Sequence, residues 1–315
     1  MIHGEILQEG CFFNANYRSA KAILKFKSDG KKKNITGLYF MSDGKMKRIV
    51  SLYIKSDGKK KYIYRAVNPY VELTFTQGVT VDLSVLSEIK MDSIDWGDGT
   101  ITSDTLTHTY ASAGTYRIIA NFNDVKSVDR QFLQNASYES KLVFNDFVNL
   151  ETINDGFLYF HQFTTGIEFN GKSKVKTIGN GFLRSSFNRG VSPFKLFDLS
   201  LVESIGNEFL GGCVKLASID LSALTKCKTI GSYFLFSTII TSLDLRNLTS
   251  LECIGTNFLH NCSNLSEIWL PQRTPPTLVR WGDGLYGISK IHCGSYLNQY
   301  KSASVWSNYS SLMVE

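Results

Sequence analysis

Apolar residues recur at a nearly constant interval through the C-terminal half of the chain. The pattern I-x-x-x-F-L begins at Ile153, Ile178, Ile205, Ile230 and Ile254, at intervals of 25, 27, 25 and 24 residues. Each copy is followed by a short segment of strand character, starting at residues 167, 197, 219, 243 and 268. A period of this length with one strand per unit predicts a solenoid whose coils stack around one continuous core.

Two of the copies share a longer pattern that connects the coil to its strand. F-L-x-x-C-x-x-L-x-x-I-x-L is matched by residues 209–221 and by residues 258–270. This pattern resembles the BspA-like class of leucine-rich repeats, which occurs in surface proteins and in phage adhesion proteins. The resemblance implies a solenoid that recognises other molecules. Additional residues at 188–193 in the second unit predict a loop that bulges from one rim.

The end of the chain has the features of a cap. Residues 271–278 interrupt the repeat with two adjacent prolines, and a last strand is predicted at 290–293. A helix is expected from residue 295, with Tyr296, Tyr300, Trp306 and Tyr309 at roughly helical spacing. Residues 294–309 resemble the closing segment that often ends such repeats. An aromatic cap would shield the core of the last coil from water.

Residues 69–128 have the pattern of a compact all-β segment. An alternating strand at 71–75 is followed by the turn D-W-G-D-G-T at 95–100 and by H-T-Y-A-S-A-G-T-Y at 108–116. Both stretches resemble the signature of PKD-type domains, immunoglobulin-like sandwiches that usually act as spacers. Trp96 is expected in the core, and the Tyr110 hydroxyl is expected to tie the corner. Asp95, Asp98 and Asp104 could bind calcium, but turn chemistry explains the first two and is favoured.

Three copies of Ser-Asp-Gly-Lys recur near the N-terminus with a period of 14 residues, at 28–31, 42–45 and 56–59. An Asp-Gly pair between strand-like runs predicts a hairpin. We therefore expect a four-stranded meander over residues 21–67, with 47–55 as one of its strands. Apolar residues alternate onto both faces, so a second layer or a partner is expected to cover the sheet. The units resemble short tandem strand-turn repeats of phage tail and fibre proteins.

Charge and cysteine content narrow the class of protein. Residues 1–68 contain 15 basic and 5 acidic residues, whereas residues 69–315 contain 19 basic and 23 acidic residues. Because the N-terminal lysines adjoin predicted turns, we interpret them as solvated turn charge rather than a nucleic-acid-binding surface. The six cysteines form no CxxC pair and are expected to be buried thiols. No secretory signal or membrane-spanning run is recognised, so we expect no membrane insertion.

One constellation of side chains is a candidate binding surface. The middle, outward position of successive repeat strands holds Glu168, Asp198, Asp220, Asp244 and Trp269. Parallel strands lie roughly 4.8 Å apart, so the carboxylates would form a ladder on the concave face, and some of their pKa values are expected to rise. The hypothesis is that this ladder contacts a basic or sugar-bearing partner or binds a cation. The favoured alternative for any one residue is an aspartate hydrogen-bonded to nearby Ser or Thr.

No catalytic or cofactor motif is recognised in the sequence. Serine-hydrolase, zinc-protease, Walker and dinucleotide signatures are all absent from the 315 residues. His260 with Cys262 and His292 with Cys293 lack the companion pair that a metal site would need, and we interpret them as packing and rim residues. We expect no enzyme activity, no metal and no cofactor.

These observations predict a mainly β, multi-domain protein. The expected segments are a basic strand-turn anchor at 1–68, a PKD-like sandwich at 69–128, BspA-like leucine-rich repeats at 129–279 and a helical cap at 280–315. The expected function is adhesion or receptor binding as a bacteriophage virion component (tail fibre, head fibre or tail-tip adhesin). Residues 1–68 would contact other virion proteins, and the repeats a host surface protein or glycan; a homo-oligomer is expected. The alternatives are a bacterial cell-surface adhesin and an accessory module of a glycan-active enzyme.

Overall fold

The computed structural model describes residues 38–315 except for 43–44, 50, 57–58, 66–68, 87–88, 90–92, 104, 131, 134–138, 162–165, 172, 187–198 and 282–286. The chain divides into two compact units, Met1–Asn68 and Pro69–Glu315, each of which is described by itself. The predicted segments 69–128, 129–279 and 280–315 all lie within the second unit. The predicted loop at 188–193 lies outside the described residues.

Two antiparallel hairpins make up the described part of the first unit. β1 (Leu38–Ser42) pairs with β2 (Lys45–Ile49), and β3 (Ser51–Ser56) pairs with β4 (Lys59–Arg65). The strands on either side of the second and third Asp-Gly pairs are therefore antiparallel partners, as predicted, with Ser42 opposite Lys45 and Ser56 opposite Lys59. The Asp-Gly pairs themselves and the first Ser-Asp-Gly-Lys segment lie outside the described residues.

The predicted four-stranded meander is not what these strands form. The two hairpins are separate two-stranded sheets, and the predicted strand 47–55 is divided between β2 and β3. An Asp-Gly turn fixes only the pairing of the two strands that it joins. The repeat therefore predicted each hairpin but not whether successive hairpins share a sheet.

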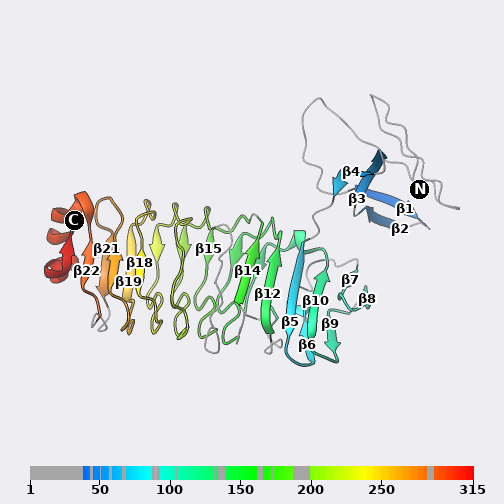
Figure 1. Cartoon of the computed structure of the whole chain (residues 1–315), viewed down its shortest axis with the longest axis horizontal. Helices are drawn as coiled ribbons and strands as arrows, with labels where there is room; N and C mark the ends of the chain where they lie inside the picture. Colours follow the sequence, from blue (N-terminus) through cyan, green and yellow to red (C-terminus); the bar gives the residue numbers. More distant parts are fainter. Residues whose placement is uncertain are drawn as a thin grey trace. The chain divides into compact units, whose positions relative to one another are not determined.

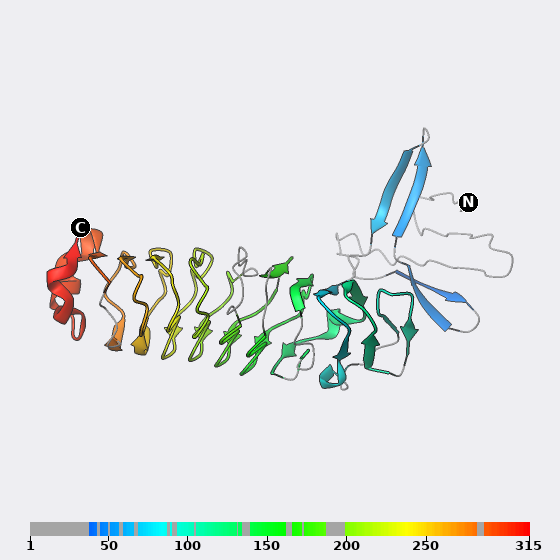
Figure 2. The same ribbon diagram turned by 60° about the horizontal axis from the view of Figure 1, so that its bottom comes forward.

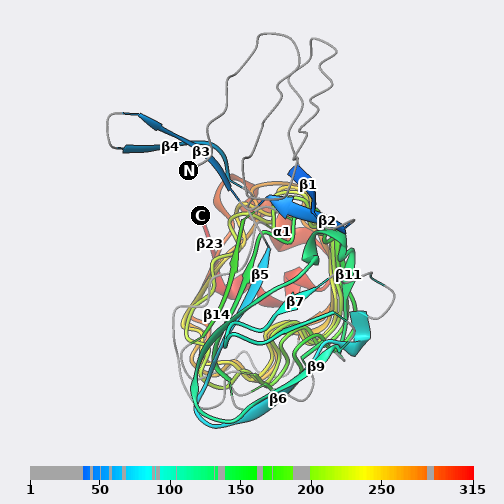
Figure 3. The ribbon, with the colours of Figure 1, turned by 90° about the vertical axis from the view of Figure 1, so that its right-hand side faces the viewer.

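The second unit is built mainly of short strands that stack side by side along one axis, which Figures 1 and 2 show from two directions. Seen end-on, the coils overlie one another (Figure 3). A seven-stranded parallel sheet runs through them, in the order β11 (Ser127–Val128), β13 (Thr152–Ile153), β15 (Thr177–Ile178), β16 (Ser204–Ile205), β17 (Thr229–Ile230), β19 (Cys253–Phe258) and β21 (Thr277–Trp281). The predicted solenoid is confirmed.

The register of this sheet aligns the isoleucine that opens each repeat copy. These isoleucines pair in sequence along β13, β15, β16, β17 and β19, and all are buried. Val128 precedes the row, and Leu278 follows it. The stack thus extends by one coil at each end beyond the five copies found in the sequence. The prolines at 275–276 do not end it, because β21 continues the sheet immediately after them.

The phenylalanine of each copy forms a second buried row. Adjacent ring centroids are 5.2–5.9 Å apart with planes 6–17° apart, along Phe157, Phe182, Phe209, Phe234 and Phe258. Phe132 extends the row at one end, at 6.3 Å, and Trp281 closes it at the other, at 5.7 Å. Close-packed aromatic rings of this size make a large contribution to burial, so this row is the spine of the core.

Neighbouring coils approach most closely just after the isoleucine. A Cβ at Gly206 would lie 2.6 Å from the backbone carbonyl carbon of Gly179, which leaves room only for glycine. At the next position, the side chain of one coil accepts a hydrogen bond from the backbone N–H of the following coil. The acceptors Asp155, Asn180 and Asn207 make these bonds at 2.7–2.8 Å. This polar ladder satisfies backbone amides in the turn.

Charged residues of alternating sign run along the rim beside the seven-stranded sheet. The backbone N–H of each donates to the carbonyl of the one before it at 2.8–2.9 Å, in the order Lys126, Glu151, Lys176, Glu203, Lys228 and Glu252. Lys228 Nζ lies 3.4 Å from Glu203 Oε2. Opposite charges on adjoining strands attract, whereas like charges repel. Each inner coil of this row therefore has oppositely charged neighbours on both sides.

A four-stranded parallel sheet forms another side of the solenoid. Its order is β18 (Ser242–Asp244), β20 (Glu267–Trp269), β22 (Lys290–His292) and β23 (Met313–Val314). The strands predicted at 243, 268 and 290 are therefore confirmed. Residues 219–222 are described but are not part of a regular strand, and the segment predicted from 197 lies largely outside the described residues.

A six-stranded sheet crosses the position where the sequence suggested a change of domain. Its order is β14 (Gly166–Asn170), β12 (Glu139–Asn145), β5 (Tyr70–Phe75), β10 (Gly114–Ile119), β7 (Ile94–Asp95) and β8 (Ile101–Thr102). β12 pairs with β14 in parallel and with β5 antiparallel, with Leu142 opposite Leu73 and both buried. Residues 69–128 therefore share a core with the repeats and cover their N-terminal end.

Shorter elements complete this end of the unit. β6 (Val79–Asp82) pairs antiparallel with β9 (Thr107–Tyr110), and two 3-10 helices, η1 (Ser84–Leu86) and η2 (Phe122–Asp124), connect the strands. Phe122 of η2 stacks on Phe147 at 5.1 Å, which ties this end to the first repeat. Residues 69–128 therefore form mainly β-structure. Their strands do not establish the predicted immunoglobulin-like sandwich.

The predicted cap covers the last coil. It consists of the 3-10 helix η3 (Gly294–Tyr296), the helix α1 (Leu297–Ser302), the 3-10 helix η4 (Trp306–Leu312) and β23. Tyr300 and Trp306 are fully buried, and Trp306 packs edge-on against Trp281 at 5.4 Å. Their polar atoms bond to the preceding proline segment: the Tyr300 hydroxyl donates to the Pro271 carbonyl and the Trp306 indole to the Pro276 carbonyl.

Candidate functional site

The residues of the predicted ladder divide between two sheets. Asp244 and Trp269 lie directly opposite each other on β18 and β20. Asp220 is close enough to Asp244 for electrostatic repulsion between the two carboxylates to act on its pKa. Glu168 lies on β14 in the six-stranded sheet. Asp198 lies outside the described residues. The structure therefore brings together three of the five residues, over the four-stranded sheet.

Local hydrogen bonds occupy the carboxylates of this row. Asp220 accepts the backbone N–H of Ser222 at 2.9 Å, and Asp244 accepts the Arg246 guanidinium at 2.6–3.1 Å. The Ser222 hydroxyl and N–H hold the pKa of Asp220 below its ordinary value, and the Arg246 side chain does the same for the pKa of Asp244. The rise expected for some carboxylates of the ladder is not found at these two, because hydrogen bonds to the charged carboxylate outweigh the effect of burial.

Trp269 lies within a stack of three flat groups. The His292 imidazole is 4.7 Å from its ring with planes 3° apart, and Arg246 Cζ is 6.0 Å from the ring on the side of β18. His292 Nε2 lies 3.0 Å from Glu267 Oε2. We call Asp244, Arg246, Glu267, Trp269 and His292 the Trp269 patch.

His292 had been interpreted from the sequence as a packing or rim residue. The strand cores L-D-L at 243–245, I-W-L at 268–270 and I-H-C at 291–293 place it next to Trp269, as the register pair Trp269–His292 now shows. That alignment of short strands was the signal that sequence reasoning did not use.

The chemistry of the Trp269 patch suits recognition through partly exposed polar groups. The Arg246 and Asp244 side chains are 55% and 48% exposed, so a partner can reach their hydrogen-bonding atoms. Because His292 and Arg246 lie on opposite sides of Trp269, the indole presents its edge rather than a free face. Glu168 has a separate ion pair, with Lys141 Nζ at 2.8 Å. A sugar ring stacked flat on Trp269 is therefore disfavoured in this arrangement.

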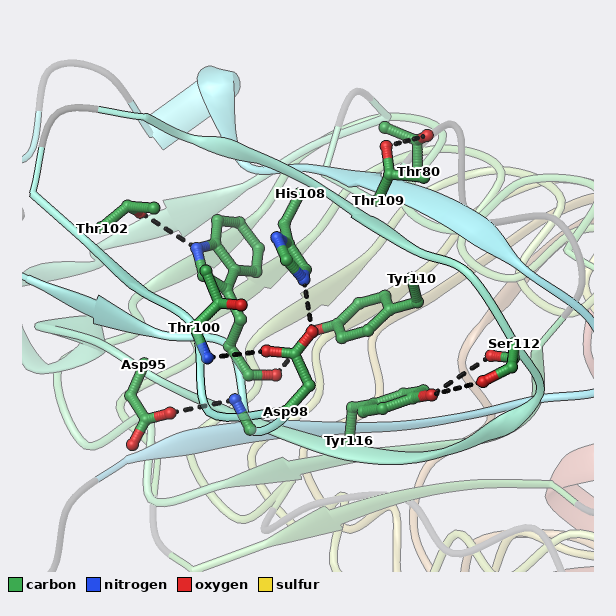
Figure 4. Close-up of polar contacts among 12 residues, drawn as sticks. Thr80, Asp95, Asp98, Thr100, Thr102, His108, Thr109, Tyr110, Ser112 and Tyr116 are labelled. Atoms are coloured by element: carbon green, nitrogen blue, oxygen red, sulfur yellow. Dashed lines mark hydrogen bonds and ion pairs between the residues drawn. The ribbon is translucent and has the colours of Figure 1, made fainter.

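The oxygen-rich turn at 95–100 uses its carboxylates internally (Figure 4). Asp95 accepts the N–H of Gly97 at 3.0 Å, and Asp98 accepts the N–H of Thr100 at 2.9 Å. The second Asp98 oxygen lies 2.7 Å from His108 Nε2. The third predicted candidate, Asp104, lies outside the described residues. Across the described ranges, no group of three or more His, Cys, Asp or Glu side chains could hold a metal ion.

Two aromatic side chains fasten this turn to the core, as predicted. Trp96 is fully buried and stacks on His108 at 5.0 Å, and the buried Tyr110 hydroxyl donates to the Trp96 carbonyl at 2.7 Å (Figure 4). Gly97 and Gly99 adopt φ values of 82° and 94°, which glycine accommodates without strain. The conformation of this turn and the orientation of its carboxylates therefore follow from hydrogen bonds within the turn and from its contacts with His108 and Tyr110.

A second group of surface residues lies on the turns that surround the buried phenylalanines. We call Tyr159, Phe160, Arg184, Tyr233 and Phe236 the aromatic edge. Phe160 and Tyr233 are 57% and 37% exposed, which is unusual for large rings in this unit. Sequence reasoning did not single these residues out. Aligning the stretches that surround F-L in the five copies would have shown that aromatic rings occupy variable positions there.

The repeats have a recognised family. Residues 184–276 match a protein-family model described as BspA type Leucine rich repeat region, in six copies. This segment carries BspA-type leucine-rich repeats. The resemblance predicted from F-L-x-x-C-x-x-L-x-x-I-x-L is thereby confirmed for the repeats, while the PKD-type and phage-type resemblances stay predictions. No curated protein matches the chain.

BspA-like repeats are commonly surface adhesion modules. Within the part of the chain that the structure describes, no helix has the length and apolar character needed to span a bilayer. Both surfaces identified above lie on or beside this type of repeat. They are therefore the candidate sites at which the repeats would contact another molecule.

Proposed function

We propose that the chain is a non-enzymatic adhesion or receptor-binding protein that recognises its target through the repeats. The observation that carries this proposal is the BspA-type repeat at residues 184–276. Coverage of both ends of the stack supports it, since residues 69–128 pack on the first coils and the aromatic cap packs on the last. A solenoid closed at its ends offers its long sides for recognition.

The proposal assigns each remaining segment a supporting role. Residues 1–68, with their basic strand-turn repeat, would anchor the protein to other proteins of an assembly. Residues 69–128, which resemble a PKD-type domain in their turn motifs, would serve as the spacer before the repeats. In this arrangement, recognition belongs to the repeats and attachment to the N-terminal unit.

We further propose that the assembly is a bacteriophage virion, put together in the host cytoplasm, with the chain acting as a tail or head fibre or a tail-tip adhesin. The support is the likeness of the Ser-Asp-Gly-Lys units to strand-turn repeats of phage tails and fibres. The target would be a host surface protein or glycan, and the chain would form a homo-oligomer. Localising the chain in intact particles by cryo-electron microscopy tests this assignment.

Two other functions fit the same repeat. A bacterial cell-surface adhesin would carry the chain on the outside of the producing cell, where antibody labelling of intact cells would detect it. An accessory module of a glycan-active enzyme would accompany glycan hydrolysis, which a reducing-sugar assay would detect. Particle location, surface labelling and hydrolysis thus separate the three functions.

The adhesion proposal predicts saturable binding of the fluorescently labelled full-length chain to the surface of target cells. If the Trp269 patch takes part, Asp244→Asn combined with Trp269→Ala should lower the affinity at least about tenfold, since each removes a contact group at its centre. Val279→Ala, which truncates an exposed residue away from the patch, should leave the affinity unchanged. Absence of saturable binding to every cell surface that adsorbs the assembled particle would contradict adhesion itself.

A further inference from the structure

The aromatic edge is organised around one arginine. Arg184 Cζ lies 5.2 Å from the Tyr159 ring centroid and 5.6 Å from that of Phe236, and its Nη1 donates to Glu208 at 2.8 Å. A guanidinium held between two rings is fixed in place by cation–π contacts as well as by its ion pair. The edge therefore has a rigid polar centre flanked by aromatic rings.

A glycine makes this arrangement possible. Phe236 belongs to a coil two positions beyond that of Arg184, and the intervening coil has Gly211 at the equivalent position. A Cβ on Gly211 would collide with the Phe236 ring, so the ring lies over the Gly211 backbone and reaches back toward Arg184. The edge is thus a continuous surface rather than isolated side chains.

Two exposed rings mark the two ends of this surface. Phe160 packs edge-on against Tyr159 at 4.1 Å, and Tyr233 packs edge-on against Phe236 at 5.8 Å. The coils of Phe160 and Tyr233 are three positions apart, which corresponds to roughly 14 Å along the stack. A ligand that touches both rings and the Arg184–Glu208 pair between them must be an extended chain.

The charges of the edge cancel. Arg184 is paired with Glu208, and the first two coils hold Arg130 and Asp155, one charge of each sign, two residues before their buried phenylalanines. A surface with balanced charge, a partly exposed Arg184–Glu208 pair and flat rings matches a ligand rich in hydroxyl groups and free of net charge.

The backbone of the same turns is already satisfied. The N–H groups of Phe160, Ser185, Gly212 and Ser237 donate to carbonyls of the next coil at 2.7–3.0 Å. An extended peptide that docks by adding a strand needs free backbone donors and acceptors. The edge offers side chains instead, which favours a carbohydrate over a peptide.

We propose that the aromatic edge binds an uncharged polysaccharide chain laid along the repeats. This inference rests on the proposed function and names a target chemistry and a surface for it. Phe160 and Tyr233 would pack against sugar rings, while Arg184 and Glu208 would exchange hydrogen bonds with hydroxyl groups. The Trp269 patch, whose indole faces are covered, is not needed for this binding.

The test is affinity electrophoresis of the full-length chain in gels that contain dextran, mannan or galactan as neutral chains, or polygalacturonate as an acidic chain. At least one neutral polysaccharide should retard the protein, and the retardation should persist in high salt because no net charge is involved. Retardation by polygalacturonate alone, or by none of the neutral chains, overturns the proposal.

The variant for this test is Phe160→Asn combined with Tyr233→Asn. Both residues have positive φ, 64° and 57°, and the coil of Phe258 carries Asn261 and Asn257 at the same two positions with φ of 59° and 55°. The substitutions therefore fit the backbone and should not impair folding, which thermal unfolding can verify. The affinity for the neutral chain should fall at least about tenfold.

Gly211→Ala provides a second variant, because it displaces Phe236 without removing a ring. It should weaken polysaccharide binding, whereas Val279→Ala, an exposed apolar change outside the edge, should not. If the chain binds cells but the double asparagine variant binds them and the polysaccharide as tightly as the parent, the edge is not the site and the adhesion proposal stands. If the chain binds no surface at all, adhesion itself fails.

Discussion

The carboxylate of Asp98 joins two segments of the chain that are ten residues apart, because it accepts the N–H of Thr100 and contacts the His108 ring. The Thr100 hydrogen bond, followed by the contact with His108, holds the pKa of Asp98 below its ordinary value of 3.8. A carboxyl whose pKa is lower in the folded state stabilises the fold above its unfolded pKa. That stabilisation is lost as the pH falls through the folded pKa.

Asp98→Asn should therefore lower the urea midpoint at pH 7, and its midpoint should fall less than that of the parent between pH 7 and pH 3. The measurement is urea unfolding followed by tryptophan fluorescence, to which Trp96, buried beside the turn, contributes. Glu252→Gln removes one carboxylate far from this turn and should retain the parental pH dependence. An Asp98→Asn profile that parallels the parental one at every pH would show that the turn does not depend on this charge.

The sequence predicted residue roles best where one side chain fits one recurrent geometry. Trp96 and Tyr110 occupy the predicted places: Trp96 fills the core beside the turn, and the Tyr110 hydroxyl donates to the Trp96 carbonyl. Of the six thiols predicted to be buried, those of Cys213, Cys227, Cys262 and Cys293 are buried, Cys253 is only partly buried, and Cys11 lies outside the described residues. Burial raises the pKa of Cys227 to about 12 and that of Cys293 to about 11. The lowered pKa of Asp220 was not foreseen, because its hydrogen bonds with Ser222 depend on backbone geometry that spacing alone does not reveal.

At the scale of elements, the conformation of each coil depends on how its backbone packs against the next coil. The glycine that follows the isoleucine in four of the five copies permits the approach of two backbones, and the polar residue after it satisfies the amides that this approach brings together. The sequence revealed the period and the apolar rows, since I-x-x-x-F-L repeats visibly. It did not reveal the ladder of Asp155, Asn180 and Asn207, because a mixture of Asp and Asn at one position looks like variation until the hydrogen bonds are seen.

Gly206→Ala tests whether this close approach controls stability. Its Cβ would lie 2.6 Å from the Gly179 carbonyl carbon and 2.8 Å from the Asn180 nitrogen, so two coils must separate. We expect a loss of roughly 2–3 kcal/mol in unfolding free energy, as for other overpacked sites, measured by urea unfolding. Gly99→Ala meets no atom within 4 Å but has φ of 94°, so only backbone strain applies. That control should lose about 1 kcal/mol, and equal losses would argue against a steric role for Gly206.

At the scale of the whole chain, the boundary between residues 68 and 69 separates two compact units. The sequence located this boundary through the change in charge and the end of the Ser-Asp-Gly-Lys repeat. It suggested a further change of domain after residue 128, whereas β5 pairs with β12 across that point. Pairing between strands that are far apart in sequence leaves no local signature, so a repeat that shares its sheet with the preceding segment looks like a separate domain.

The C-terminal cap provides the last prediction, because a stack of coils is only as stable as its end coils. Trp306 is fully buried, lies 5.4 Å from Trp281 and 5.3 Å from Tyr300, and donates to the Pro276 carbonyl at 2.8 Å. Trp306→Ala should cost roughly 3–5 kcal/mol. Since each coil contacts mainly its neighbours, the loss should appear first in β21 and spread toward β11.

Hydrogen exchange of the parent and variant chains measures that order of opening. The amides of β21 should exchange faster in Trp306→Ala, while those of β11 and β13, at the far end of the same sheet, should keep their protection under native conditions. Tyr309→Ala, which removes a half-buried ring 5.0 Å from Trp281, should give a smaller effect confined to the same strand. Equal acceleration at both ends of the sheet would mean that the second unit opens as one cooperative block, and the cap would then stabilise the whole unit rather than its last coil.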